Sequence, residues 1–104
     1  MPNMDQLQAF VSAADHGSFS AAARQLGKAQ SAISTAVINL EIDTGIDLFD
    51  RSQRNPKLTD AGNLMLKHAR SILQGNAEFM ALATSISEGV EAKLGIAVEQ
   101  GIFV

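Results

Sequence analysis

The apolar residues near the N-terminus recur with the period of one helix face. They are separated by steps of three and four and comprise Met4, Leu7, Phe10, Val11 and Ala14. This spacing predicts a helix over residues 4–14 that packs one face on a core. The run Asp15-His16-Gly17-Ser18 then predicts a turn. Ser18 is a candidate N-cap, because its hydroxyl can accept a hydrogen bond from a free backbone N–H.

Two further periodic stretches follow this turn. The first predicts a helix over residues 19–26 with the inward side chains Phe19, Ala22, Ala23 and Leu26. Gly27 ends it, because glycine readily adopts the left-handed conformation that stops a helix. The second runs up to Gly45, with an apolar face of Ile33, Val37 and Leu40 and an uncharged outer face of Gln30, Ser31, Ser34 and Thr35. Ile38 and Ile42 are apolar residues on this mostly polar face, and the pattern assigns them no role.

Residues 46–58 are too short and too irregular for another helix. Leu48 and Phe49 are apolar, a polar stretch containing Pro56 follows, and Lys57-Leu58 returns to an apolar residue. This order predicts a small hairpin with a polar tip, which we call the wing.

The longest periodic segment begins after the wing. Thr59 can cap it, and Asp60 would lie at the positive end of the helix dipole. Its most regular row, which we call the seam, alternates steps of four and three: Met65, Ala69, Ile72, Asn76, Phe79, Ala83 and Ile86. A heptad pattern of this length predicts a helix of roughly 40 Å, and a second apolar row widens the stripe through Leu66, Leu73, Ala77 and Met80. One small neighbouring domain could not cover that surface, so we expect a partner.

The pattern changes again after Gly89. Leu94, Ile96 and Val98 alternate with other residues, which predicts a short strand, and the chain ends on the apolar run Gly101-Ile102-Phe103-Val104. A single strand is not stable alone. We therefore expect a further domain beyond this sequence.

Composition excludes several classes of protein. The chain has 104 residues, which favours one small domain and excludes a two-domain enzyme. It has no cysteine, which excludes disulfides, thiol nucleophiles and cysteine-based zinc sites and fits a reducing compartment. It has no tryptophan or tyrosine, unlike proteins that stack single-stranded nucleic acid. No positively charged leader and no apolar run of membrane-spanning length is present, so we expect a soluble cytoplasmic protein without a membrane partner.

The charge is uneven along the chain. The net charge is −3, which does not suit a general nucleic-acid coat protein. Residues 17–40 nevertheless carry Arg24 and Lys28 without an acid, and residues 51–58 carry three cations without an acid. The face that carries the predicted second and third helices and the wing is therefore locally positive, as the approach of phosphates requires. The alternative is a scatter of surface cations without a common role.

A short helix, a tight turn with glycine and a helix with a polar outer face are typical of a helix-turn-helix, whose second helix enters the DNA major groove. Ala23 is small enough to let these two helices cross closely, and Ile33 could fill the space between them. An ordinary three-helix core is the structural alternative.

Spaced anchors over residues 4–88 make a family resemblance specific. They are Gly17-Ser18-Phe19-Ser20-Ala21-Ala22-Ala23, Leu26, Gln30-Ser31-Ala32-Ile33-Ser34, Leu40-Glu41, Gly45, Leu48-Phe49-Asp50-Arg51 and Leu58-Thr59-Asp60-Ala61-Gly62. This pattern resembles the N-terminal region of LysR-type transcriptional regulators. The resemblance implies a mainly α fold: a winged helix-turn-helix over residues 1–58, a linker helix over 59–88 that pairs in a homodimer, and over 89–104 a hinge and the first strand of an absent effector-binding domain.

The resemblance also implies a DNA-binding surface on a bacterial transcription factor. Base reading falls on Gln30 and Ser31, phosphate contact on Ser34, and minor-groove contact on Arg54. The remaining members of the expected DNA-binding set are Lys28, Thr35, Arg51 and Lys57. Arg51 suits a salt bridge with an acid such as Glu41 as well as it suits a phosphate.

The sequence departs from the family pattern at several positions. Ala29 replaces the usual capping Ser or Thr, Lys28 an apolar residue and Thr44 a leucine, while Thr35 and Ala36 stand where basic or amide side chains are common. We expect weaker phosphate contacts and more reliance on the wing and on dimerisation. A tetramer is a further possibility for a full-length protein, and a small-molecule inducer would act only through the absent domain.

Enzymatic function is not expected. No nucleophile elbow, phosphate-binding loop, dinucleotide fingerprint or zinc-protease helix is present, and no cofactor or metal cluster is indicated. Of the two histidines, His16 is expected in a turn and His68 beside the seam, solvated or at an interface. The alternative function is a helical dimeric adaptor that binds protein without binding DNA. Steep salt dependence of DNA binding would separate the regulator from the adaptor.

Overall fold

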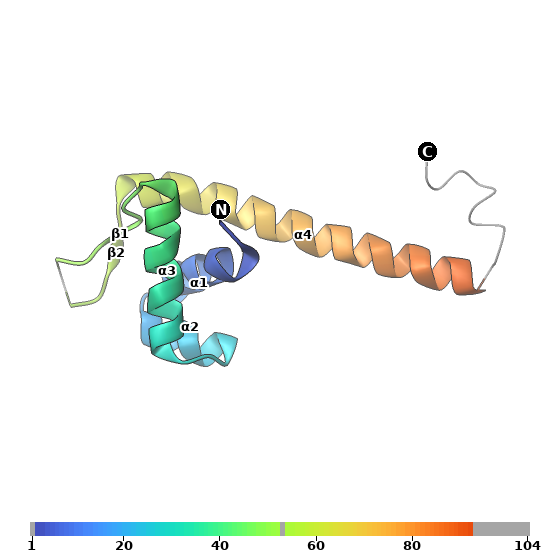
Figure 1. The fold of residues 1–104 in the computed structure, drawn as a ribbon, viewed down its shortest axis with the longest axis horizontal. Helices are drawn as coiled ribbons and strands as arrows, with labels where there is room; N and C mark the ends of the chain where they lie inside the picture. Colours follow the sequence, from blue (N-terminus) through green and yellow to red (C-terminus); the bar gives the residue numbers. More distant parts are fainter. Residues whose placement is uncertain (1, 53, 93–104) are drawn as a thin grey trace. The chain divides into compact units, whose positions relative to one another are not determined.

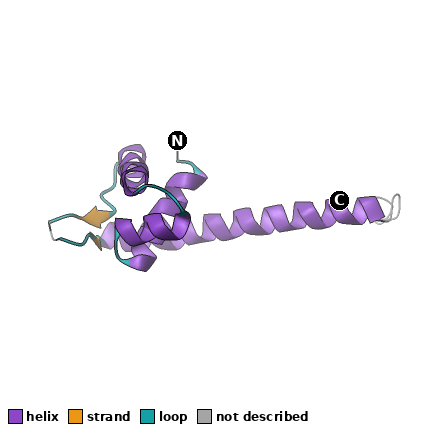
Figure 2. Ribbon diagram, turned by 90° about the horizontal axis from the view of Figure 1, so that it is seen from below, coloured by secondary structure: helices purple, strands orange, loops and turns teal. Residues whose placement is uncertain are grey.

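The computed structural model describes residues 2–52 and 54–92. Its elements are, in chain order, α1 (Met4–His16), α2 (Phe19–Leu26), α3 (Gln30–Thr44), β1 (Phe49–Asp50), β2 (Lys57–Leu58) and α4 (Asp60–Ala92) (Figure 1). Figure 2 shows a mostly helical chain whose two short strands are confined to the wing. The described residues fall into two compact units, with the division between Leu73 and Gln74. The mainly α fold and the predicted order of helices and hairpin are confirmed.

Helix α1 begins with a reciprocal cap that the hydrophobic pattern did not reveal. The Asn3 side chain accepts from the Gln6 backbone N–H at 2.9 Å, and the Gln6 side chain accepts from the Asn3 N–H at 2.9 Å. The helix ends at Gly17, whose φ of 75° is left-handed. The predicted end at Ala14 was wrong, and His16 lies in the last turn of α1 rather than in a loop. The physical reason is that Gly17 is the first residue here that adopts this conformation without strain.

Helices α2 and α3 form the predicted helix-turn-helix. The Ser18 hydroxyl accepts from the Ala21 N–H at 3.0 Å, which confirms the predicted cap. Gly27 ends α2 with a φ of 66°, and α3 follows after Ala29 without a side-chain cap, as the departure at this position implied. Gly45 ends α3 in the same left-handed conformation.

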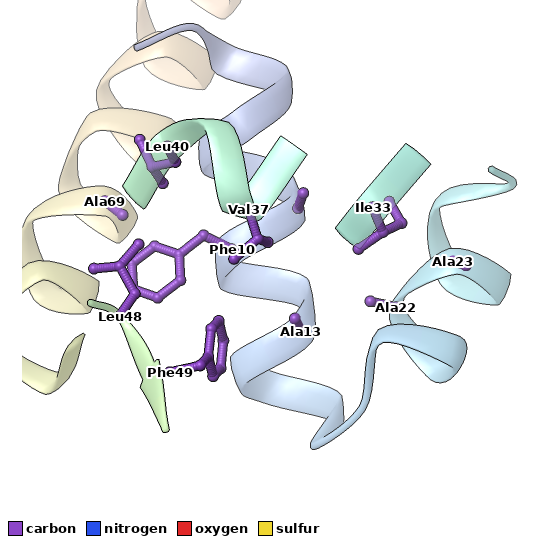
Figure 3. Close-up of a cluster of buried hydrophobic side chains, with 11 residues drawn as sticks. Phe10, Ala13, Ala22, Ala23, Ile33, Val37, Leu40, Leu48, Phe49 and Ala69 are labelled. Atoms are coloured by element: carbon purple, nitrogen blue, oxygen red, sulfur yellow. The ribbon is translucent and has the colours of Figure 1, made fainter. Parts of the chain in front are cut away.

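The core lies where α1, α2 and α3 meet the wing. Ala22 and Ile33 are fully buried between α2 and α3, and the Ile33 side chain points toward α2 (Figure 3). The Phe49 ring makes edge-to-face contacts with Phe10 and Phe19 at centroid distances of 5.7 and 5.6 Å. These contacts pack β1 against both α1 and α2 and so fix where the wing leaves the core. Ala23, the small residue predicted to let α2 and α3 cross closely, is also buried, with 5% of its surface exposed.

The wing is a two-stranded antiparallel hairpin. Phe49 pairs with Leu58 and Asp50 pairs with Lys57. Side chains alternate between the two faces of a strand, so Phe49 faces the core while Asp50 is exposed. The predicted hairpin is confirmed, with its polar tip between these two strands.

Helix α4 starts where predicted and ends later than predicted. The Thr59 hydroxyl accepts from the Gly62 N–H at 2.8 Å, which confirms Thr59 as the cap. The helix continues to Ala92, so Gly89 does not end it. A glycine inside a helix costs only about 1 kcal/mol relative to alanine, which favourable neighbours can offset. The predicted strand at Leu94–Val98 and the apolar terminus lie outside the described residues.

A bidentate ion pair joins α4 to the end of α1. Arg70 Nη1 donates to Asp15 Oδ2 at 3.1 Å, and Arg70 Nη2 donates to Asp15 Oδ1. The hydrogen bond from Arg70 lowers the pKa of Asp15 below its ordinary value of 3.8. Both side chains are about half exposed, so solvent screens the pair.

We expect Asp15→Asn to lower the free energy of unfolding near neutral pH by less than about 1 kcal/mol. Because the folded pKa of Asp15 is depressed, the contribution of the pair is present above pH 3.8 and is lost as the pH falls through the lower folded value. Urea unfolding of both proteins at neutral and at strongly acidic pH measures this difference. A difference that persists at acidic pH would contradict the assignment.

Candidate nucleic-acid interface

The outer face of α3 is polar, exposed and free of internal partners. Gln30, Ser31 and Thr35 are exposed and Ser34 is half-buried. Within residues 2–52 and 54–92, none of these four side chains forms a hydrogen bond or an ion pair. The opposite face of α3, which carries Ile33, is packed in the core. Core packing therefore fixes the orientation of α3 while its outer polar groups stay available to a ligand.

The expected cations come from α2, from the turn before α3 and from the wing, and they differ in their interaction partners. Lys28 Nζ lies 3.9 Å from Asp5 Oδ1, a loose and exposed pair. Arg24 Nη1 donates to the Ser20 hydroxyl at 3.0 Å. Arg54 and Lys57 are exposed in the wing, and neither makes an ion pair with another residue in the described part of the chain. The wing thus carries two positive charges that have no ion-pair partner among the described residues.

Arg51 is held at the base of the wing by Glu41. Its Nη1 lies 2.9 Å from Glu41 Oε1, and its guanidinium lies 5.7 Å from the centre of the Phe19 ring. Glu41 Oε2 also accepts the backbone N–H groups of Leu48 and Phe49, at 2.8 and 3.3 Å. Of the two roles that the sequence left open for Arg51, the salt bridge with Glu41 is present. The carboxylate of Glu41 joins the end of α3 to the start of the wing.

Asp50 shapes the chain just after β1. Its Oδ1 accepts from the Ser52 backbone N–H at 2.9 Å. This hydrogen bond from the backbone, together with one from the Ser52 side chain, lowers the pKa of Asp50. Asp50 therefore stays ionised at neutral pH and reduces the positive charge at the base of the wing.

The seam residues of α4 fall into two environments. Ala69 is 3% exposed in the core of the first unit and Met65 packs against that core, so the single chain already covers both. Ile72, also in the first unit, is 47% exposed. In the second unit Asn76 and Ala83 are exposed, Ile86 is half-buried, and Phe79 is 70% exposed. The heptad pattern did not distinguish core residues from exposed ones, because both recur with the same period.

Neither histidine belongs to a candidate metal-binding group in the part of the chain that the structure describes. His16 ends α1 and His68 is exposed on α4. Among the described residues, no three acidic, histidine or cysteine side chains are grouped as metal ligands. None of the helices in residues 2–52 and 54–92 has the length and apolar character that crossing a membrane requires.

Comparison with known families agrees with this geometry. The sequence model described as "Bacterial regulatory helix-turn-helix protein, lysR family" matches residues 4–63, which include α1, α2, α3 and the wing. The HTH-type transcriptional regulator AceR of Acinetobacter baumannii is 38% identical over 96 residues, which are 92% of this chain and 32% of that protein. The probable HTH-type transcriptional regulator LtrA of Klebsiella pneumoniae is 36% identical over 99 residues, 95% of this chain and 32% of that protein.

Solved structures show the same fold. One is a complex of the BenM DNA-binding domain with catB site 1 DNA, which matches this chain with a TM-score of 0.79 at 30% identity. The match covers 84% of this chain and 97% of the BenM chain. The OxyR C206 mutant of Corynebacterium glutamicum has a TM-score of 0.77 at 34% identity and covers 82% of this chain and 27% of that one. The chain thus spans about a third of the length of the curated relatives AceR and LtrA. By its matched helices, its wing and these relatives, the chain belongs to the LysR family of bacterial regulatory helix-turn-helix proteins.

Proposed function

We propose that this chain is the DNA-binding segment of a homodimeric transcription regulator that recognises a specific double-stranded sequence. The observation that carries the proposal is the uncharged, exposed and internally unpartnered outer face of α3, with Lys28 before it and the cationic wing beside it. Uncharged polar side chains can read base edges, and the cations around them can approach phosphates. The complex of the BenM DNA-binding domain with DNA, at 30% identity, supports this function.

In this proposal the N-terminal end of α3 enters the major groove. The Gln30 amide carries a donor and an acceptor and can pair with adenine through two hydrogen bonds, while Ser31 contacts a neighbouring base edge. Ser34 and Thr35 lie along the same helix and contact the backbone at the groove wall. Arg54 enters the flanking minor groove, where local negative potential attracts a guanidinium. Phosphate contacts come from Lys28 and Lys57. The N–H groups of Arg51 that are not bonded to Glu41 contribute further phosphate contacts.

Dimerisation would place two copies of α3 on two half-sites. The exposed apolar side chains in the second unit include Phe79, Met80 and Leu82. Isolated apolar residues on a surface are common, but three large ones within four positions of a helix favour an interface. We propose that α4 pairs with its counterpart in a second copy through Phe79, Ala83 and Ile86, with Ile72 and Asn76 on the same row.

We propose that the whole protein extends beyond this segment. An inducer, if the protein has one, would bind a further domain, and the protein would act in the cytoplasm, where bacterial DNA is found. Its proposed activity is binding without covalent chemistry.

We expect Gln30→Ala to weaken binding to the preferred duplex by about 5- to 150-fold, because a good bidentate pair is worth about 1–3 kcal/mol of discrimination. Binding to random duplex should change little, since phosphate contacts are retained. Fluorescence anisotropy at two salt concentrations measures both, after the preferred sequence has been selected from random duplexes.

The matched control is Gln8→Ala, which removes an exposed glutamine from α1, far along the chain from α3. It should leave both affinities unchanged. Equal losses for Gln30→Ala on preferred and random duplex would rule out base reading by Gln30. A folded dimer without salt-dependent DNA binding would favour the adaptor instead.

We expect Phe79→Asp to convert the dimer into a monomer. The substitution would place an unpaired charge in a buried interface, which is strongly destabilising. Light scattering across a range of concentrations measures the oligomeric state. Ala81→Asp introduces the same charge on the opposite side of α4 and should leave the dimer intact; a dimer that survives Phe79→Asp would reject this interface.

A further inference from the structure

Two large apolar side chains are exposed on α3 without a function. Ile38 is 43% exposed and Ile42 is 70% exposed. Exposing a large aliphatic side chain to water is unfavourable, by an amount that burial against a ligand would recover. Neither residue belongs to the core cluster that holds α3 in place.

Both isoleucines lie on the face that we assign to DNA. Steps of four, three and four residues connect Ser31, Thr35, Ile38 and Ile42, and such steps keep side chains on one side of a helix. Along the helix axis, Ile38 lies about 10 Å from Ser31 and Ile42 about 16 Å from it, at 1.5 Å per residue. The major groove is about 12 Å wide, so Ile38 can lie within it when the N-terminal end of α3 is inserted. Ile42 is then close to the groove edge.

The surroundings of Ile38 favour a nucleic acid over a charged protein partner. The row that contains it has no acidic side chain. Glu41, the nearest acid along α3, uses its carboxylate for Arg51 and for the backbone of Leu48. No carboxylate on this row therefore repels a phosphate backbone.

Thymine is the base that offers an apolar group in the major groove, its C5-methyl. We propose that Ile38 contacts thymine methyl groups there and is a specificity-determining residue of this protein. This inference rests on the proposed DNA binding and extends it: Gln30 and Ser31 read polar base edges near the start of α3, and Ile38 selects thymine about two turns further along.

The test replaces thymine by uracil, which lacks only the methyl group. After selection of a preferred duplex with the 104-residue chain, each thymine is changed to uracil in turn and the affinity is measured. We expect at least one position per half-site at which uracil weakens binding by about fourfold, the loss for one buried methyl group. Ile38→Ala should bind the thymine duplex about as weakly as the unchanged protein binds the uracil duplex, and should no longer distinguish the two.

Ile42→Ala provides the matched control, because it removes the same side chain from the same row one turn further from the groove. It should keep the uracil penalty. Circular dichroism and light scattering confirm that each variant is folded and has the same oligomeric state as the unchanged protein.

Several outcomes separate this inference from the proposed function. A preferred duplex without any uracil penalty, or a penalty that survives Ile38→Ala, overturns the thymine contact and leaves the proposed function standing. Loss of the dimer in Ile38→Ala, without a uracil penalty in the unchanged protein, assigns this residue to a protein contact. Absence of any preferred duplex overturns both proposals.

Discussion

Replacing Gly62 with alanine is expected to lower the free energy of unfolding by about 3 kcal/mol, the upper range for overpacking a core. A Cβ atom at Gly62 would lie 2.1 Å from the backbone oxygen of Leu48 and 3.1 Å from Leu58 Cδ2. The Leu48 oxygen is not free to move, since it accepts the Thr59 N–H at 3.0 Å. The first turn of α4 therefore packs directly on the backbone at the base of the wing, and any side chain larger than hydrogen separates them.

Gly75→Ala is the matched control for this prediction. Gly75 also lies in α4, but a Cβ atom there would meet no other atom within 4 Å. Alanine should increase the stability of the helix by about 0.5–1 kcal/mol, because glycine loses more backbone entropy on folding. Urea unfolding followed by circular dichroism measures both variants. The two substitutions are expected to change the free energy of unfolding in opposite directions. A loss below about 1 kcal/mol for Gly62→Ala would show that the backbone at the base of the wing can shift to accommodate the methyl group.

Removal of the Glu41 carboxylate is expected to have a comparably large effect. In Glu41→Ala, the N–H groups of Leu48 and Phe49 lose their acceptor, and Arg51 loses its ion-pair partner. Each buried donor left unsatisfied costs about 1–3 kcal/mol. We therefore expect Glu41→Ala to destabilise the fold by about 3 kcal/mol, with the wing as the first part to loosen.

Two related variants separate the contributions of Glu41. Glu41→Gln retains a carbonyl oxygen that can accept from the backbone and should cost less than half as much as Glu41→Ala. Arg51→Ala removes only a partly exposed partner and its contact with the Phe19 ring, and should cost about 1 kcal/mol. Thermal unfolding of the three variants ranks them. If Arg51→Ala proved as costly as Glu41→Ala, the ion pair rather than the backbone hydrogen bonds would hold the wing.

Local signals were sufficient for most element boundaries. Gly27 and Gly45 end their helices with positive φ, and Ser18 and Thr59 cap theirs, as their residue types predicted. These features succeed because the interactions involved span four residues or fewer. The same reasoning failed at Ala14, where polarity suggested a turn before Gly17 was reached, and at Gly89, which is tolerated inside a long helix.

The candidate site was only partly predictable. The exposure of Gln30, Ser31 and Thr35 followed from the helical period, since Ile33 had to face the core. The pairing of Arg51 with Glu41 remained one of two alternatives. The two residues are ten positions apart, and a helix end and a turn lie between them, so the sequence does not predict the distance between their side chains. The division of the seam at Ala69 was missed for a similar reason: an apolar residue at a heptad position suits a core and an interface equally.

The sequence by itself determined the helices, the ends of α2 and α3, the hairpin and the polar face of α3, since these depend on local spacing and on residues with restricted or unusual backbone preferences. Only the tertiary structure decided that Gly62 must remain without a side chain, that Glu41 holds the wing and that Ala69 belongs to the core. Each of these depends on atoms distant in sequence coming within a few ångströms, and packing of the whole unit sets those distances.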